Sequence, residues 1–132
     1  MNCRVDYQTF VQNKKHSTGS YGFDPVWMPE SAFDFQQHII TKAIKKGRIG
    51  MFADTGLGKT LMQVAIAENI IRQTNKRVLI LTPLAVAFQF IDEAARIGVD
   101  DIAHSKDGTI SKKITVCNYE RLHLLNPDDF AC

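Results

Sequence analysis

The stretch from residue 53 to residue 60 combines residue types and spacing that suit the binding of phosphate. It reads Ala53-Asp54-Thr55-Gly56-Leu57-Gly58-Lys59-Thr60. Gly56 and Gly58 can adopt backbone angles that other residues avoid, so the N–H groups of the loop can surround an anion. Lys59 offers a positive charge to terminal phosphates, and the Thr60 hydroxyl is suited to hold Mg²⁺, so both side chains could assist phosphoryl transfer. The whole stretch from Asp54 to Thr60 therefore predicts contact with ATP or ADP and its magnesium ion.

The segments on both sides of this loop fit that chemistry. An apolar run at 49–53 predicts a short buried strand, and residues 61–71 predict a helix. A Walker A phosphate loop works between a strand and a helix, because the positive end of the helix dipole faces the phosphate. The general pattern opens with glycine, whereas position 53 is alanine. The competing interpretation is a plain glycine turn that leaves Lys59 exposed.

The composition is that of an ordinary globular protein. The chain has 132 residues, 45% of them hydrophobic and 23% charged, which is enough for one domain with its own core. The net charge of +2 is too small to indicate a nucleic acid partner by itself. Three widely spaced cysteines argue against a disulfide framework or a zinc site, so we expect a cytoplasmic protein. No apolar stretch approaches the length of a transmembrane helix.

The rest of the sequence alternates between expected helices and expected strands. Residues 1–30 predict an irregular N-terminal arm that lays its scattered aromatics on the body, and residues 31–132 predict the folded domain. The expected elements are a helix from Ala32 to Lys46, capped by Ser31 and ended by Gly47, a strand at 77–82, a helix at 84–96, strands at 101–104 and 114–117, and a helical piece at 119–125. The buried stripe of the first helix is expected to comprise Phe35, Ile39, Ile40, Ala43 and Ile44. This alternation predicts an α/β fold with a mostly parallel sheet.

Two residues of the first expected helix suit the recognition of adenine. The segment Phe33-Asp34-Phe35-Gln36 resembles the Q-motif region of superfamily-two helicases and translocases. In that family an aromatic residue and a glutamine read adenine, which implies this role for Phe35 and Gln36. A glutamine amide can pair with both the N6 and the N7 positions of adenine. The alternative for Gln36 is an ordinary surface position on an amphipathic helix.

Two later segments resemble the same family in the expected order. Leu81-Thr82-Pro83-Leu84 resembles a motif that touches the nucleic acid backbone, which implies that role for Thr82 and Pro83. The segment from Val116 to Leu122 reads VCNYERL and resembles one found in Swi/Snf-like and phage-borne members. It implies that Asn118 and Tyr119 contact a sugar-phosphate backbone. The alternatives are a simple strand-to-helix junction at Thr82 and a helix N-cap at Asn118.

The chain is thus similar to the opening of a superfamily-two ATPase. The resemblance implies a partial RecA-like P-loop NTPase domain over 31–132, an ATP-hydrolysing helicase or translocase as the parent activity, and DNA rather than RNA as the partner. The family's next strand ends in a Mg²⁺-binding Asp-Glu pair, and its second domain supplies an arginine finger. We find neither in the sequence, so we expect nucleotide binding with little turnover. The alternative is a non-enzymatic remnant or interaction module that keeps the fold.

The expected strand at 49–53 also bears on self-association. In the RecA-like sheets that the chain resembles, this strand lies between strands contributed by later sequence. Here it would form an open edge, which is a template for pairing with a second copy. We therefore expect a homo-oligomer, and the alternative is that the N-terminal arm covers the edge.

Overall fold

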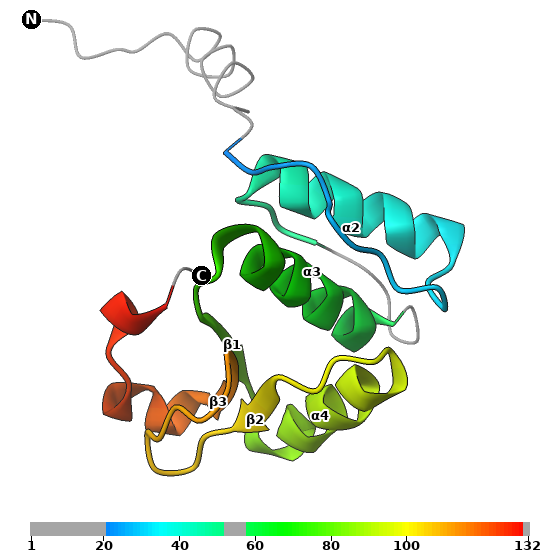
Figure 1. Cartoon of the computed structure of the whole chain (residues 1–132). Helices are drawn as coiled ribbons and strands as arrows, with labels where there is room; N and C mark the ends of the chain where they lie inside the picture. Colours follow the sequence, from blue (N-terminus) through cyan, green and yellow to red (C-terminus); the bar gives the residue numbers. More distant parts are fainter. Residues whose placement is uncertain (1–20, 52–57, 131–132) are drawn as a thin grey trace, which may run out of the picture.

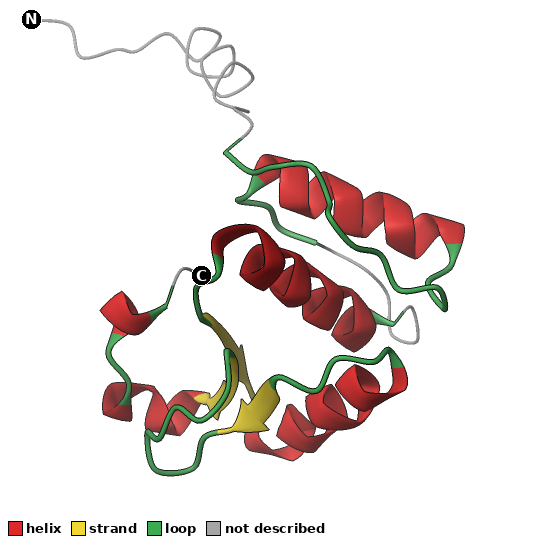
Figure 2. Ribbon diagram, viewed as in Figure 1, coloured by secondary structure: helices red, strands yellow, loops and turns green. Residues whose placement is uncertain are grey.

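The computed structural model describes residues 21–51 and 58–130, which form an α/β fold with helices flanking a small parallel sheet (Figures 1 and 2). The α-helices are α2 (Asp34–Lys46), α3 (Lys59–Thr74) and α4 (Ala87–Arg96). Helix α2 packs on α3, α3 packs on α4, and α4 packs on the sheet. Among the described residues, none of the helices has the length and apolar character needed to cross a membrane. The expected fold class is confirmed.

Among the described residues, the sheet contains three parallel strands, and the last of them in the chain lies in the centre. These are β1 (Val78–Thr82), β2 (Ile102–His104) and β3 (Ile114–Asn118), in the order β1-β3-β2. Val78 and Ile102 both lie opposite Ile114, on the two sides of β3. All five residues of β3 are buried, as expected for a central parallel strand covered on both faces. Three short 3₁₀ turns complete the fold: η1 (Leu84–Val86), η2 (Tyr119–Leu124) and η3 (Pro127–Asp129).

Helix α2 begins two residues later than the sequence predicts. Its N-cap is Phe33 and not Ser31, because the side-chain oxygen of Gln36 accepts the Phe33 N–H at 2.9 Å. Gly47, with φ of 73°, ends the helix as predicted. The buried stripe comprises Gln36, Ile40, Ala43 and Ile44. The prediction that Phe35 belongs to this stripe is wrong, because its side chain is 43% exposed. It precedes Gln36 by one residue and therefore points about 100° away from it around the helix.

Helix α3 is buried on two faces because it lies between α2 and the other elements. Val64, Ala67 and Ile71 join the core that includes the sheet and α4. Met62 and Ala65 join a second cluster with residues of α2. Helix α3 is therefore packed from both sides (Figure 1).

The strand predicted at 49–53 is not present in its described part. Residues 49–51 have no strand structure, and residues 52 and 53 lie outside the described residues. Ile49 is 40% exposed. A strand exists only where a neighbour supplies backbone partners, and none of the described residues forms a ladder with 49–51. The sequence pattern identifies 49–51 as apolar, but it does not show which strand, if any, lies next to this segment.

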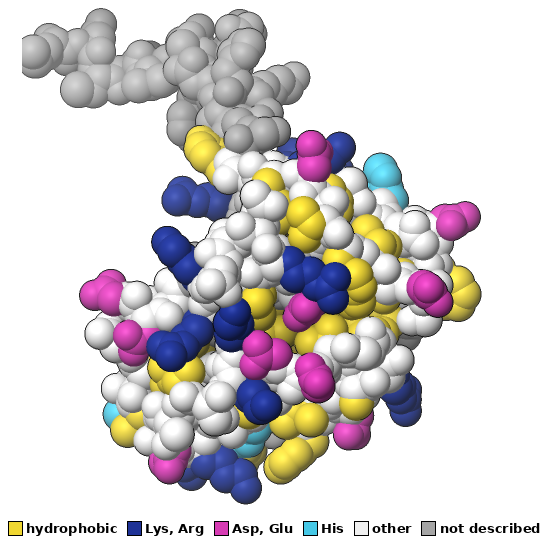
Figure 3. Space-filling view, viewed as in Figure 1, with side chains coloured by type: hydrophobic (Ala, Val, Ile, Leu, Met, Phe, Trp, Pro, Cys, Tyr) yellow, Lys and Arg dark blue, Asp and Glu magenta, His cyan; other side chains and the backbone are white. Residues whose placement is uncertain are grey.

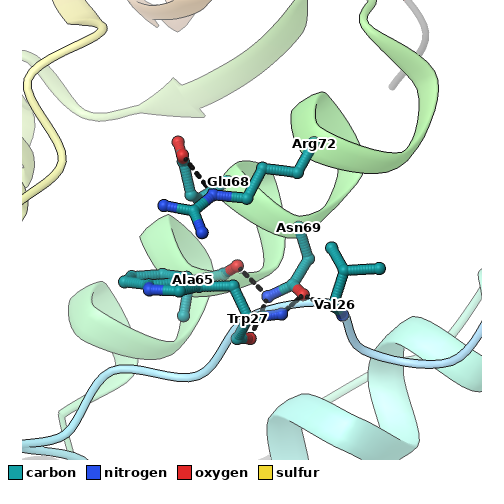
Figure 4. A network of polar contacts seen from close by, with 6 residues as sticks. All are labelled: Val26, Trp27, Ala65, Glu68, Asn69 and Arg72. Carbon is teal, nitrogen blue, oxygen red and sulfur yellow. Dashed lines mark hydrogen bonds and ion pairs between the residues drawn. The ribbon is translucent and has the colours of Figure 1, made fainter.

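The described part of the arm is held to α3 by a buried asparagine (Figure 4). The Asn69 side chain is fully buried, and its oxygen accepts the N–H groups of Val26 and Trp27 at 2.9 and 3.0 Å. Its amide group donates to the carbonyls of Trp27 and Ala65 at 2.9 and 2.8 Å. Arg72 lies over the Trp27 ring, 4.8 Å from its centroid. The segment at 21–30 therefore packs on the body.

Candidate functional site

The start of helix α3 holds the described part of the loop that the sequence predicts to bind phosphate. Gly58 precedes the helix and has a left-handed backbone, with φ of 75° and ψ of 40°. Lys59 and Thr60 are the first two residues of α3, where Lys59 is exposed and Thr60 is half-buried. The first turn carries no acidic residue, so nothing in that turn opposes an anion at the positive end of the helix dipole. Asp54, Thr55, Gly56 and Leu57 lie outside the described residues, and their roles stay predictions.

The side chain of Gln36 lies against this glycine. Gln36 is 5% exposed, and its amide nitrogen is so close to Gly58 that a Cβ added there would overlap it. Position 58 therefore favours glycine because its φ is positive, and a Cβ there would also displace the end of the Gln36 side chain. The structure thus brings Gln36, which is expected to read adenine, next to Gly58, which belongs to the predicted phosphate loop.

An exposed aromatic pair stands beside Gln36 at the start of α2. The rings of Phe33 and Phe35 are nearly parallel, with an interplanar angle of 12° and centroids 6.1 Å apart. Phe33 is 68% exposed, so the pair presents an aromatic surface to solvent. Such a surface is suited to stacking against a planar ring.

A second group of predicted residues lies at the carboxyl ends of the strands. Thr82 ends β1 and lies opposite Asn118, which ends β3. Both are 3% exposed. The Thr82 hydroxyl donates to the carbonyl of Pro83 at 2.9 Å, and Pro83 is exposed just before η1. Because carboxyl ends of parallel strands are where α/β folds place binding sites, this neighbourhood is a second candidate region.

Asn118 has one polar group engaged and one free at this edge. Its amide nitrogen donates to the Glu120 carboxylate at 2.7 Å, and this bond is the main cause that lowers the pKa of Glu120. Its Oδ1 is buried and has no hydrogen-bond partner among the described residues. Asn118 does precede the turn η2, but its side chain does not cap it. Tyr119, which follows, is 57% exposed.

The start of α3 and the strand ends at Thr82 and Asn118 are two separate groups of predicted site residues. No hydrogen bond between described residues joins the start of α3 to the edge formed by Thr82 and Asn118. Among the described residues, no three His, Cys, Asp or Glu side chains are grouped to hold a metal ion, so a Mg²⁺ role for Thr60 stays a prediction. The contact of Gln36 with Gly58 has no signal in the sequence, because it depends on how α2 packs on α3. The bonds of Asn69 have one: an asparagine inside an apolar helix pattern needs hydrogen-bond partners if it is buried.

Comparisons with known proteins identify the fold. No protein-family model matches the sequence, and no curated protein matches it significantly. Among solved structures, the UvsW helicase from bacteriophage T4 superposes with a TM-score of 0.61 at 13% sequence identity. The alignment covers 90% of this chain and 45% of the helicase, so the chain spans less than half of that protein's length. At this identity the similarity shows the fold alone, and that fold is a partial RecA-like α/β domain.

Proposed function

We propose that this chain forms the ATP-binding part of a nucleic-acid-dependent ATPase of the helicase or translocase type. The observation that carries the proposal is the contact of Gln36 with Gly58 at the start of α3. It joins two predicted nucleotide contacts that the sequence separates, one for the base and one for the phosphates. The fold shared with a phage helicase is consistent with this assignment.

In the proposed complex the nucleotide follows the start of α3. The loop from Asp54 to Gly58 surrounds the phosphates with its N–H groups. Lys59 neutralises the terminal phosphates from its exposed position, and the Thr60 hydroxyl holds Mg²⁺. The base lies near Phe35 and the Gln36 amide. The Gln36 oxygen accepts the Phe33 N–H, and its amide carries both donor and acceptor groups, the types that pair with the edge of adenine.

The nucleic acid in this proposal lies along the carboxyl ends of β1 and β3. The unpaired Oδ1 of Asn118 can accept a hydroxyl or amide donor, and the exposed Tyr119 ring can stack on a base or sugar. Thr82 and Pro83 lie on the adjacent strand end. Basic and acidic side chains are intermixed on the face of the molecule shown in Figure 3. We propose DNA rather than RNA as the partner.

The proposal is tested by calorimetry of Mg-ATP binding. The Lys59→Ala variant should bind about ten- to a hundredfold more weakly than the unchanged chain, because a charge-assisted contact contributes about 1.5–3 kcal/mol. Lys112→Ala removes an exposed lysine at the opposite ends of the strands and should bind normally. If all three proteins bind Mg-ATP with equal affinity, the loop is not part of the nucleotide site. A folded chain that binds no nucleotide would favour the interaction-module alternative.

A further inference from the structure

The carboxyl ends of the three strands bring Thr82, His104 and Asn118 to one face of the sheet. Thr82 lies opposite Asn118, whereas His104 lies opposite Val116, two residues earlier in β3. Because side chains alternate between the two faces of a strand, residues two positions apart share a face. Val116 belongs to the same core as Phe90 of α4. The shared face is therefore the one that α4 covers.

Phe88, in the first turn of α4, lies at this end of the sheet. Its ring meets the His104 ring edge-to-face, with centroids 5.7 Å apart and an interplanar angle of 68°. The neighbouring Ala87 and Phe90 are buried, whereas Phe88 is 57% exposed. The Phe88 ring is therefore in contact with His104 and still mostly open to solvent.

His104 contacts Phe88 through its ring and not through a hydrogen bond. Both ring nitrogens of His104 are buried and have no hydrogen-bond partner among the described residues. Edge-to-face aromatic pairs are favourable beyond the area that they bury. The aromatic contact is thus the directional interaction that the structure gives His104, and it holds the Phe88 ring in place.

A second exposed aromatic residue and two cations follow the neighbouring strand ends. Tyr119 follows β3 and is 57% exposed. Lys106 comes soon after β2, and the Arg121 guanidinium donates to its carbonyl. Both cations are exposed, and neither forms an ion pair among the described residues. The carboxylates of Asp107 and Glu120 accept hydrogen bonds from residues of their own turns. These strand ends thus combine exposed rings with exposed positive charge.

This combination suits a single strand of nucleic acid. Unpaired bases stack on exposed aromatic rings, while cations contact the phosphates. The buried Oδ1 of Asn118, which has no partner among the described residues, adds a hydrogen-bond acceptor on the same face. In a duplex the faces of the bases are already covered by one another, so they do not stack on such rings.

We propose that Phe88 is a second base-stacking residue of the nucleic-acid site, that His104 is the positioning residue that holds its ring, and that the ligand is single-stranded. This inference rests on the proposed function, in which Tyr119 supplies the first stacking contact. Bases of one strand stack on Tyr119 and on Phe88, beside the ends of β3 and β2. Lys106 and Arg121 contact the phosphates of that strand.

Fluorescence anisotropy with a labelled single-stranded oligothymidine at low salt tests the role of Phe88. Phe88→Ala should weaken binding about five- to 150-fold, the range expected for loss of one stacking contact. Phe88→Leu keeps the apolar bulk but has no aromatic face, so it should also weaken binding, whereas Phe88→Trp should retain the affinity. Val26→Ala removes an apolar side chain of similar exposure from the arm and should have no effect. Binding of a blunt duplex of the same length should not change in Phe88→Ala.

The positioning role of His104 is tested by its dependence on Phe88. His104→Ala should weaken binding of the oligothymidine. His104→Phe keeps an aromatic ring and breaks no hydrogen bond between described residues, so it should retain the affinity. In a Phe88→Ala chain, His104→Ala should have no further effect, because the ring through which it acts is gone. Urea unfolding of each variant identifies those that are folded.

Three results overturn the proposal. They are unchanged oligothymidine binding by folded Phe88→Ala and Phe88→Leu, an equal loss for the duplex, and an equal effect of His104→Ala with and without the Phe88 ring. If Tyr119→Ala weakens binding and the Phe88 variants do not, this inference fails while the proposed nucleic-acid site stands. If the unchanged chain binds no oligothymidine, both fail, and Mg-ATP calorimetry still tests the nucleotide site separately.

Discussion

The amide of Gln36 occupies the space that a side chain at Gly58 would fill. Gln36 lies in the first turn of α2, whereas Gly58 precedes the first turn of α3. The same glutamine caps its own helix through the Phe33 N–H. A substitution at Gly58 should therefore disturb the first turn of α2 through Gln36. This coupling connects the expected base contact to the expected phosphate contact within one packed arrangement.

Gly58→Ala should destabilise the chain by at least about 1–2 kcal/mol, the cost of a left-handed backbone for a non-glycine residue. It should cost more than that, because the new Cβ would push the Gln36 amide from its place. The double variant Gln36→Ala/Gly58→Ala tests the second part, since without the amide the overlap disappears. Urea unfolding of the two single variants and the double variant gives the coupling free energy. If the free-energy losses of the two single variants add up to the loss of the double variant, the two residues do not interact.

Asn69→Ala should lower the free energy of unfolding by about 2–4 kcal/mol, because it leaves several buried backbone groups of the arm and of α3 without partners. Limited proteolysis should also cut the segment at 21–30 sooner. Gln73→Ala, an exposed position on the same helix, serves as the control and should stay within about 0.5 kcal/mol of the unchanged chain. Equal loss in both variants would show that Asn69 does not anchor the arm.

Tyr119→Ala should weaken binding to a single-stranded oligothymidine about five- to 150-fold, the range expected for loss of one stacking contact of about 1–3 kcal/mol. Tyr119→Phe should keep most of the affinity if the ring is what binds. Tyr21→Ala removes another exposed tyrosine, which lies beside Arg48, and should have no effect. Fluorescence anisotropy at low salt measures all three. Equal weakening by Tyr21→Ala and Tyr119→Ala would remove the strand ends from the nucleic acid site.

Cys117 should resist alkylation in the folded chain at pH 8. Burial raises the pKa of its thiol, and the weaker effect of Arg121 only partly opposes this. The thiolate is the reactive form, so a raised pKa leaves the thiol protonated and inert where an ordinary thiol begins to ionise. Mass spectrometry after treatment with iodoacetamide should find Cys117 unmodified in buffer and modified in urea. Rapid modification of the native chain would show that this strand is not buried.

The local elements of this chain follow from its sequence, because their determinants lie within a few residues of one another. Apolar spacing and Gly47 define α2 to within two residues, and the alternation of elements indicates a parallel α/β fold. The helix predicted at 61–71 is present as α3, which is longer and runs from Lys59 to Thr74. Gly58, with its left-handed backbone, precedes it.

The tertiary structure alone decided the remaining features, because their partners are distant in sequence. The apolar segment at 49–51 has the composition of a strand, yet it forms none without a described neighbour to share its backbone hydrogen bonds. Strand β1 resembles a buried strand in its sequence, but among the described residues it pairs with β3 on one side and meets a single bridge, Arg77 with Phe130, on the other. A glutamine is usually exposed, and the burial of Gln36 against Gly58 follows only from the packing of α2 on α3. Periodicity specifies which face of an element is apolar, whereas its neighbour is selected by the packing of the whole chain.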